Sequence, residues 1–162
     1  MTLGHTPSQT VGPYYAIGLC RRTDNELVAP DAPGALELTG RLLDGQGEPV
    51  VDGMIEVWDA VGGRWGRSGT HPEGQYSFVV AKPEAEDGRA PRLDVFVFAR
   101  GLLRHQLTRV YFPDEPEANA ADPVLSVLGE RERQTLVARQ QGASLLFDIT
   151  MQGDSATVFF AH

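Results

Sequence analysis

Leu36-Glu37-Leu38-Thr39-Gly40-Arg41-Leu42 is the stretch that decides the fold, because its apolar and polar positions alternate. A period of two puts successive side chains on opposite faces of a strand, so the stretch predicts a half-buried strand. Asp44-Gly45-Gln46-Gly47 follows it as a turn. Further short apolar runs come at 54–59, 75–80, 93–98, 106–112, 144–151 and 157–160. About seven or more short strands separated by turn residues indicate an all-β chain folded as an antiparallel β-sandwich.

A short helical insertion is expected between Val124 and Ala138, where apolar residues partly follow helical spacing. Asp122-Pro123 supplies a cap and a first-turn proline for this insertion. Gly129 is expected to divide it into two short pieces.

Residues 1–34 form an irregular N-terminal arm with four prolines and no clear period. Such a stretch on a compact domain is typical of a lid, a linker or a segment docked on another molecule. A frayed tail is the simpler alternative. The pair Tyr14-Tyr15 beside Ile17 and Leu19 favours docking over fraying, because such side chains seek burial.

Composition limits the class of protein. The 162 residues suit a single domain, and 41% apolar with 22% charged residues is typical of a soluble globular chain. Acidic residues outnumber basic ones by 22 to 14, and the resulting charge of −8 disfavours nucleic acid as a partner. Cys20 is the only cysteine, which excludes an internal disulfide and a cysteine metal cage. The sequence shows neither a signal peptide nor an apolar run of membrane-spanning length, so a cytoplasmic location is expected.

The spacing of residues does not by itself point to a reaction. The histidines His5, His71, His105 and His162 form neither an HxH nor an HxxxH pair, so each is expected at the surface rather than on a metal. The chain has no glycine-rich phosphate loop before a helix and no GxSxG nucleophile motif. Composition and spacing alone therefore reach only a cytoplasmic β-sandwich domain.

Three segments taken together, with the terminal run as an additional likeness, carry a resemblance to a known family. They are TPSQTVGPYY at 6–15, a stretch at 38–65 that includes IEVWD and GRW, a stretch at 90–112 that includes FARG and TRVYF, and VFF at 158–160. In this order the chain resembles the intradiol ring-cleaving dioxygenases, most closely the iron-free subunit of the two-chain members. The resemblance implies one intradiol-dioxygenase-like β-sandwich over residues 1–162, with residues 1–34 as an arm that docks on the partner subunit.

The family holds ferric iron with two tyrosines and two histidines, and this sequence departs from that set. Trp65 stands where the first tyrosine is expected, and an indole N–H is not a metal ligand. The loop 84–87 contains no tyrosine to serve as the second. Arg92 and Asp94 replace the HxH pair; the arginine stays protonated, and one carboxylate does not make a site. Because these positions depart from the family's ligand set, we expect no metal ligand and no catalytic residue in this chain. Arg92 and Asp94, which share one strand face, are expected to form a charge pair or to face solvent.

The resemblance also implies a partner, a beta subunit of related fold that holds the Fe(III) cofactor, in αβ units assembled into a larger symmetric oligomer. Together the chains would convert protocatechuate and O2 to 3-carboxy-cis,cis-muconate in aromatic catabolism, by the β-ketoadipate pathway. The implied substrate-binding residues on this chain are Thr10, Gly12, Pro13, Tyr14 and Arg100. An arginine at that place favours an anionic aromatic acid by direct charge attraction.

Several alternatives stay open at this point. Arg100 could be a strand-end surface residue, and Tyr14 could serve only to pack the arm. The whole chain could be a non-enzymatic β-sandwich binding module, which the fold alone supports. A single-chain enzyme with relocated ligands is disfavoured by the absence of HxH.

Overall fold

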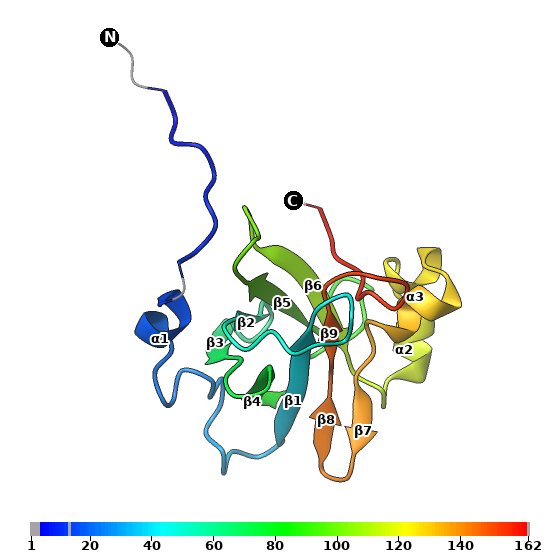
Figure 1. Ribbon diagram of the computed structural model, residues 1–162. Coiled ribbons are helices and arrows are strands. Elements are labelled where there is room, and N and C mark those ends of the chain that lie inside the picture. The colour runs from blue at the N-terminus through cyan, green and yellow to red at the C-terminus, as the bar shows by residue number, and fades with distance from the viewer. Residues whose placement is uncertain (1–3, 13, 162) are drawn as a thin grey trace.

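Two β-sheets packed face to face form the body of the protein (Figure 1). The structure is a computed structural model, and it describes residues 4–12 and 14–161. One sheet has the strand order β4-β1-β8-β7, with β9 also beside β1, and the other has the order β3-β2-β5-β6. The β-sandwich predicted from the strand pattern is confirmed.

The strands are β1 (Ala35–Leu43), β2 (Met54–Asp59), β3 (Arg64–Gly69), β4 (Gln75–Ala81), β5 (Arg92–Phe98), β6 (Gln106–Tyr111), β7 (Arg139–Gln141), β8 (Ser144–Leu146) and β9 (Ile149–Thr150). The helices are α1 (Tyr15–Leu19), α2 (Pro116–Ala121), the 3-10 turn η1 (Leu125–Val127) and α3 (Glu130–Gln134). Among the described residues, none of these helices has the length and apolarity needed to cross a membrane.

Strand β1 is the centre of the first sheet. It pairs antiparallel with β4, from Ala35 opposite Ala81 to Arg41 opposite Gln75. Strands β8 and β9 pair with β1 in parallel, so this sheet is mixed and the purely antiparallel expectation is wrong for it. The chain reaches β8 from the helical region through the β7–β8 hairpin, which sends β8 along the direction of β1. The second sheet is antiparallel throughout.

The core lies between the sheets and comes from the inward positions of the alternating strands. Leu38 and Leu42 of β1 are fully buried, whereas Glu37 and Arg41 on the opposite face are exposed. Burying each such large apolar side chain contributes roughly 1.5–3 kcal/mol. The core cluster is completed by Ile55, Val57, Tyr76, Phe78, Val80, Leu93, Val95, Val97, Val110, Phe112, Ala138, Leu145, Phe147 and Ile149.

Five of the predicted runs are confirmed as strands to within one residue at each end, namely β1, β2, β4, β5 and β6. The run 144–151 is divided into β8 and β9, because the Asp148 carboxylate accepts the backbone N–H of Arg41 at 3.1 Å in place of a ladder carbonyl. The prediction of a strand at 157–160 is wrong. There Val158 N donates to Thr135 Oγ1, and only Phe160 forms an isolated bridge, with Leu107.

The helical insertion is shorter and more interrupted than predicted. Asp122 does act as a cap, since its Oδ1 accepts the N–H groups of Val124 and Leu125, at 2.8 and 3.1 Å. The residues that follow form only η1, and Gly129 then separates η1 from α3, as predicted. Helix α2 lies before the predicted stretch. Leu136 leaves the helical region because its carbonyl accepts the N–H of Tyr111 on β6.

The N-terminal arm has one part that leaves the sandwich and one part that lies on it (Figure 1). Residues 4–10 are exposed, whereas the segment 24–27 runs along the outer edge of β4. Leu27 N donates to Val79 O, and Val79 N donates to Asn25 O, both at 2.9 Å. Arg67 N on β3 donates to Asp24 O at 2.7 Å. The segment therefore ties together the outer strands β3 and β4 of the two sheets.

The expected burial of the apolar side chains of the arm holds only in part. Tyr15 is half-buried, but Tyr14 is 77% exposed, and Ile17 and Leu19 are exposed as well. Within this single chain the arm therefore leaves Tyr14, Ile17 and Leu19 in solvent, whereas Leu27 packs against the core.

Candidate functional site

The outer face of the second sheet carries the positions at which the family's metal ligands are expected. Trp65 of β3 lies directly opposite Trp58 of β2, and both indoles are partly exposed. The Arg67 guanidinium lies 4.8 Å from the Trp65 ring centroid and forms an ion pair with Glu56, with Nε 2.8 Å from Oε1. Trp65 therefore takes part in a cation–π contact on an ion-paired surface.

Asp94 forms an ion pair across the sheet with Arg109 of β6, at 2.9 Å between Oδ1 and Nε. The prediction that Asp94 pairs with Arg92 is therefore wrong. Arg109 stands directly opposite Asp94 in the β5–β6 register, whereas Arg92 lies two residues along the same strand, about 7 Å away. Arg92 instead reaches back to Ala90 O at 3.5 Å, and its buried Nε finds no hydrogen-bond partner among the described residues.

The space beside these residues does not suit iron. A cavity of about 10 Å³ lies there, which is room for one water molecule at most. Its lining is Trp58, Ala60, Val61, Glu84, Arg92 and Asp94. Within residues 4–12 and 14–161, no three His, Cys, Asp or Glu side chains gather in a way that could hold a metal ion. The residues present at this position do not fit the family's iron.

Arg100 lies just beyond β5, and contacts from two other parts of the chain hold it. Its Nε forms an ion pair with the carboxylate of Asp52, which precedes β2. Thr10 Oγ1 accepts the N–H of the next residue, Gly101, at 2.8 Å. The Tyr15 hydroxyl donates to the carbonyl of Phe98, two residues before Arg100. The structure thus brings Thr10 and Arg100 together.

The other predicted site residues lie on the exposed arm. Gly12 is exposed, and a Cβ built on it meets no atom within 4 Å, so packing within this chain does not require glycine there. Pro13 lies outside the described residues. Tyr14 precedes α1, where its carbonyl accepts the N–H of Gly18 at 2.9 Å and its side chain faces solvent.

Asp52 and Tyr15 contact the candidate site around Arg100, and the sequence did not predict either contact. Burial raises the pKa of Tyr15, and the negative charge of Asp52 raises it further, so the hydroxyl stays protonated and donates at neutral pH. For Tyr15 the aromatic pair Tyr14-Tyr15 in the sequence did indicate that a side chain there would be buried. Asp52 had none, because it stands far from Arg100 in the sequence and only the β2–β5 pairing brings the two together.

Two hollows flank Arg100. One of about 300 Å³ lies between the arm and the β5–β6 connection and is lined by Gln9, Val11, Phe98, Ala99, Leu102, Leu103, Arg104 and His105. The His105 ring packs 5.4 Å from the rings of both Phe96 and Phe98. The other, of about 450 Å³, lies beside α1 and is lined by Ala16, Ile17, Cys20, Val51, Asp52, Gly53, Gly69, Thr70 and His71.

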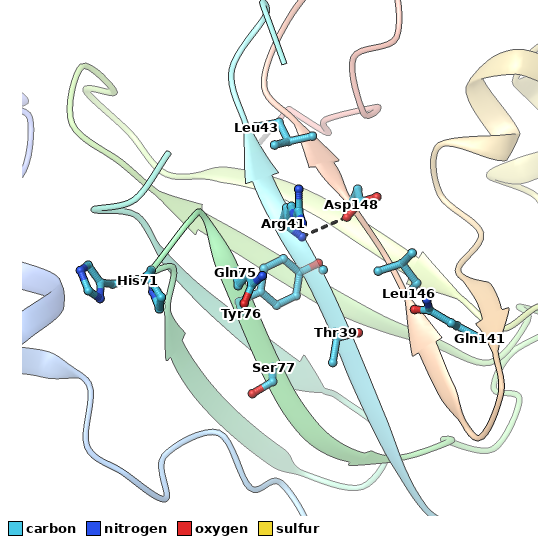
Figure 2. A pocket seen from close by; sticks show the side chains of 12 residues that line it. Thr39, Arg41, Leu43, His71, Gln75, Tyr76, Ser77, Gln141, Leu146 and Asp148 are labelled. Carbon is cyan, nitrogen blue, oxygen red and sulfur yellow. Dashed lines mark hydrogen bonds between the residues drawn. The ribbon is translucent and has the colours of Figure 1, made fainter. Parts of the chain in front are cut away.

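A further hollow, of about 620 Å³, lies on the outer face of the first sheet (Figure 2). Thr39 and Arg41 of β1, Ser77 of β4 and Leu146 of β8 line it. Its carboxylate, Asp148, is already bonded to the backbone of Arg41 and to the Arg139 guanidinium, the latter at 2.8 Å. The carboxylate of this groove is therefore engaged within the chain.

Comparison with known proteins gives relatives along nearly the whole chain. It is 41% identical to the protocatechuate 3,4-dioxygenase alpha chain of Burkholderia cepacia and 36% identical to that of Pseudomonas putida. The first alignment covers 98% of each chain, and the second covers 98% of this chain and 96% of the relative. The Burkholderia alignment extends over 193 positions, so at least 31 of them have no counterpart in these 162 residues. The protocatechuate 3,4-dioxygenase beta chain of Burkholderia cepacia is 30% identical, over 74% of this chain and 65% of its own.

Solved structures of dioxygenases have a similar fold, although no protein-family model matches the chain. The dioxygenase domain of a carbohydrate-binding fusion protein from Streptomyces sp. SirexAA-E has a TM-score of 0.63 at 25% identity, covering 91% of this chain and 98% of its own. An intradiol ring-cleavage dioxygenase from Tetranychus urticae shares the fold, with a TM-score of 0.65 at 14% identity and coverages of 91% and 94%. The chain belongs to the protocatechuate 3,4-dioxygenase alpha-chain family, within the intradiol ring-cleavage dioxygenases.

Proposed function

We propose that the chain is the iron-free subunit of a two-chain protocatechuate 3,4-dioxygenase, whose Fe(III) is held by a beta subunit of related fold. The assembled enzyme opens the ring of protocatechuate with O2 and gives 3-carboxy-cis,cis-muconate. One observation carries the proposal. A chain 41% identical to an alpha chain has, where the family's ligands are expected, the Asp94–Arg109 ion pair and a cavity of about 10 Å³. The likeness to a beta chain supports a partner with the same fold.

This chain contributes one wall of the substrate pocket, formed by Thr10, Gly12, Pro13, Tyr14 and Arg100. The exposure of the Tyr14 and Arg100 side chains supports the assignment, because groups in solvent can still meet a substrate or a partner. Arg100 attracts the carboxylate of the aromatic acid by charge. Such positioning matters to the rate, since a misplacement of about 1 Å can slow a reaction on the order of 100-fold.

The arm, residues 1–34, docks on the beta subunit. Support comes from the large apolar side chains of Tyr14, Ile17 and Leu19, which this chain leaves exposed together with nearby Val51. The αβ units assemble further by symmetry, and the enzyme works in the cytoplasm as part of aromatic catabolism by the β-ketoadipate pathway.

Co-expression with the beta subunit of the same organism tests the proposed function. We expect a complex on size-exclusion chromatography that contains iron, shows the red-brown iron–tyrosinate absorption and consumes O2 with protocatechuate. The chain alone is expected to be colourless and inactive, because its residues do not fit iron. An isolated chain that held stoichiometric iron and cleaved protocatechuate would overturn the proposal. A monomer that ignored the beta subunit would point to a separate binding module.

A further inference from the structure

Asp52 holds Arg100 by one edge of its guanidinium group. The ion pair joins Asp52 Oδ2 to Nε, the nitrogen nearest the backbone. A guanidinium has five N–H donors, and Nε carries only one of them. The other four lie on the two terminal nitrogens, which can bind a carboxylate as a fork of parallel hydrogen bonds. The Arg100 side chain is 59% exposed, so this terminal end can be reached from solvent.

The backbone on both sides of Arg100 is fixed by the arm. The Thr10 hydroxyl accepts the N–H of Gly101, and the Tyr15 hydroxyl donates to the carbonyl of Phe98. Gly101 has a backbone φ of +89°, which residues with a Cβ rarely adopt, so the chain turns sharply just after Arg100. With its backbone held at two points, the remaining freedom of Arg100 lies in its side-chain torsions.

Asp52 itself stands on a rigid support. The next residue, Gly53, is buried and donates its N–H to Thr70 Oγ1 at 2.8 Å. A Cβ at Gly53 would lie 2.5 Å from Leu42 Cδ2, so the turn is packed closely on the core. The carboxylate of Asp52 is only 26% exposed, in contrast to the arginine it holds. A largely covered anion on a closely packed turn is thus paired with a more exposed cation.

We propose that Asp52 is a positioning residue of the reaction, which holds Arg100 through Nε so that its terminal fork binds the carboxylate of the aromatic acid. This inference rests on the function proposed above and adds the residue that sets the preference for a carboxylate-bearing catechol over a neutral one. The negative charge of Asp52 also repels the substrate carboxylate. That repulsion is screened by solvent, and we expect it to change KM by less than about threefold, whereas losing an oriented fork costs about tenfold.

The test uses the assembled complex and a double-mutant cycle of Asp52→Asn and Arg100→Gln. Asp52→Asn is expected to raise KM for protocatechuate about tenfold, with kcat within about twofold, and to leave the inhibition constant of unsubstituted catechol unchanged. In the Arg100→Gln background the same change is expected to have no further effect, because Asp52 acts through Arg100. Asp52→Glu, which keeps the charge, is expected to recover most of the affinity.

Asp148→Asn is the matched control. Asp148 pairs with Arg139, and the two side chains are 31% and 69% exposed, close to the values for Asp52 and Arg100. It changes the net charge equally, so KM is expected to stay within about twofold. If Asp52→Asn does not assemble, Arg100→Lys replaces it. Lysine keeps the charge but has neither Nε nor a fork, so the same rise in KM is expected.

Two results would overturn the inference while leaving the proposed function intact: an unchanged KM for Asp52→Asn or Arg100→Lys, or effects of Asp52→Asn and Arg100→Gln that simply add. Failure of the wild-type chains to assemble or to cleave protocatechuate would instead count against the proposed function. Thermal unfolding of each isolated variant shows whether a loss of activity comes from misfolding.

Discussion

At the scale of single residues, the carboxylates of this chain differ mainly in their burial and in the donors that they accept hydrogen bonds from. Asp122 is completely buried and accepts four hydrogen bonds, from the N–H groups of Ala90, Val124 and Leu125 and from the hydroxyl of Tyr111. It connects the start of β5, the helical insertion and the end of β6. A buried carboxylate with this many donors is structural, because its removal leaves N–H groups in the interior without acceptors.

We therefore predict that Asp122→Ala lowers the free energy of unfolding by about 3 kcal/mol, as measured by urea denaturation of the isolated chain. Asp114→Ala is the control. Its carboxylate pairs with Lys82 at 2.7 Å on the surface, and its loss is expected to cost less than about 1 kcal/mol. Equal effects of the two substitutions would contradict the structural role of Asp122.

Only the resemblance to the family allowed residues of the candidate site to be predicted from the sequence; their spacing alone did not. Arg100 and Thr10 do lie together, yet no local spacing could have shown that Asp52 is the ion-pair partner of Arg100. For Asp94 the sequence predicted the shared strand face but missed the cross-strand partner Arg109, because register is set by the packing of the sheet. Which charged side chains pair with one another depends on the tertiary structure, and the spacing of residues in a single sequence does not show it.

At the scale of elements, β1 is the strand on which the first sheet depends, and Gly40 is its tightest position. A Cβ built on Gly40 would lie 1.9 Å from the carbonyl oxygen of Phe147 and 2.7 Å from the hydroxyl of Tyr76. The Tyr76 hydroxyl donates to that same carbonyl. The chain after β8 thus approaches β1 so closely that only glycine fits.

Gly40→Ala is accordingly expected to destabilise the fold by about 3 kcal/mol, since backbone and a buried hydroxyl must both move. Gly69→Ala on β3 is the matched strand variant, because a Cβ there meets only Cys20 Sγ, at 3.8 Å. That change is expected to alter the stability by less than about 1 kcal/mol. Chemical denaturation of both variants distinguishes a steric effect from a general cost of replacing a strand glycine.

The elements that the sequence predicted are those whose own pattern is strong. The alternation in β1 and the apolar runs of β2, β4 and β5 arise from burial on the core face, which periodicity reports directly. Strand β3 contains Gly66 and Gly69 among polar residues, and it forms because β2 lies beside it. The predicted strand at 157–160 does not form, although its residues are apolar. Its apolar side chains pack against the body of the protein, while Thr135 Oγ1 accepts the backbone N–H of Val158 that a strand partner would otherwise receive.

At the scale of the whole molecule, the response to alkali follows from buried tyrosines. Burial raises the pKa of Tyr111 to about 12, and the charge of Asp122 adds to the effect. Burial also raises the pKa of Tyr76 well above its ordinary value of 10.0. In the unfolded chain these hydroxyls ionise near pH 10. The unfolded state therefore loses protons before the folded state does, and rising pH favours unfolding.

We predict that the free energy of unfolding falls as pH rises above about 10, by roughly 1.4 kcal/mol per pH unit for each such tyrosine. For Tyr111 this decline extends from about pH 10 to about pH 12. Urea denaturation at a series of pH values measures the slope, and Tyr111→Phe is expected to make it shallower in that window. Below pH 9 the variant and the natural chain should have parallel profiles. An unchanged slope above pH 10 would contradict the assignment.

The segment 24–27, described above as a tie between the two sheets, also shields the molecule from uncontrolled association. An open strand edge presents free N–H and C=O groups that can pair with another chain and start aggregation. On β4 those groups are engaged at Val79 by Asn25 and Leu27. At the other end of the same sheet, β7 is only three residues long, exposed, and composed of an arginine and two glutamines. The first sheet thus offers a poor template for like chains, so copies of this chain are hindered from pairing with one another through these edges.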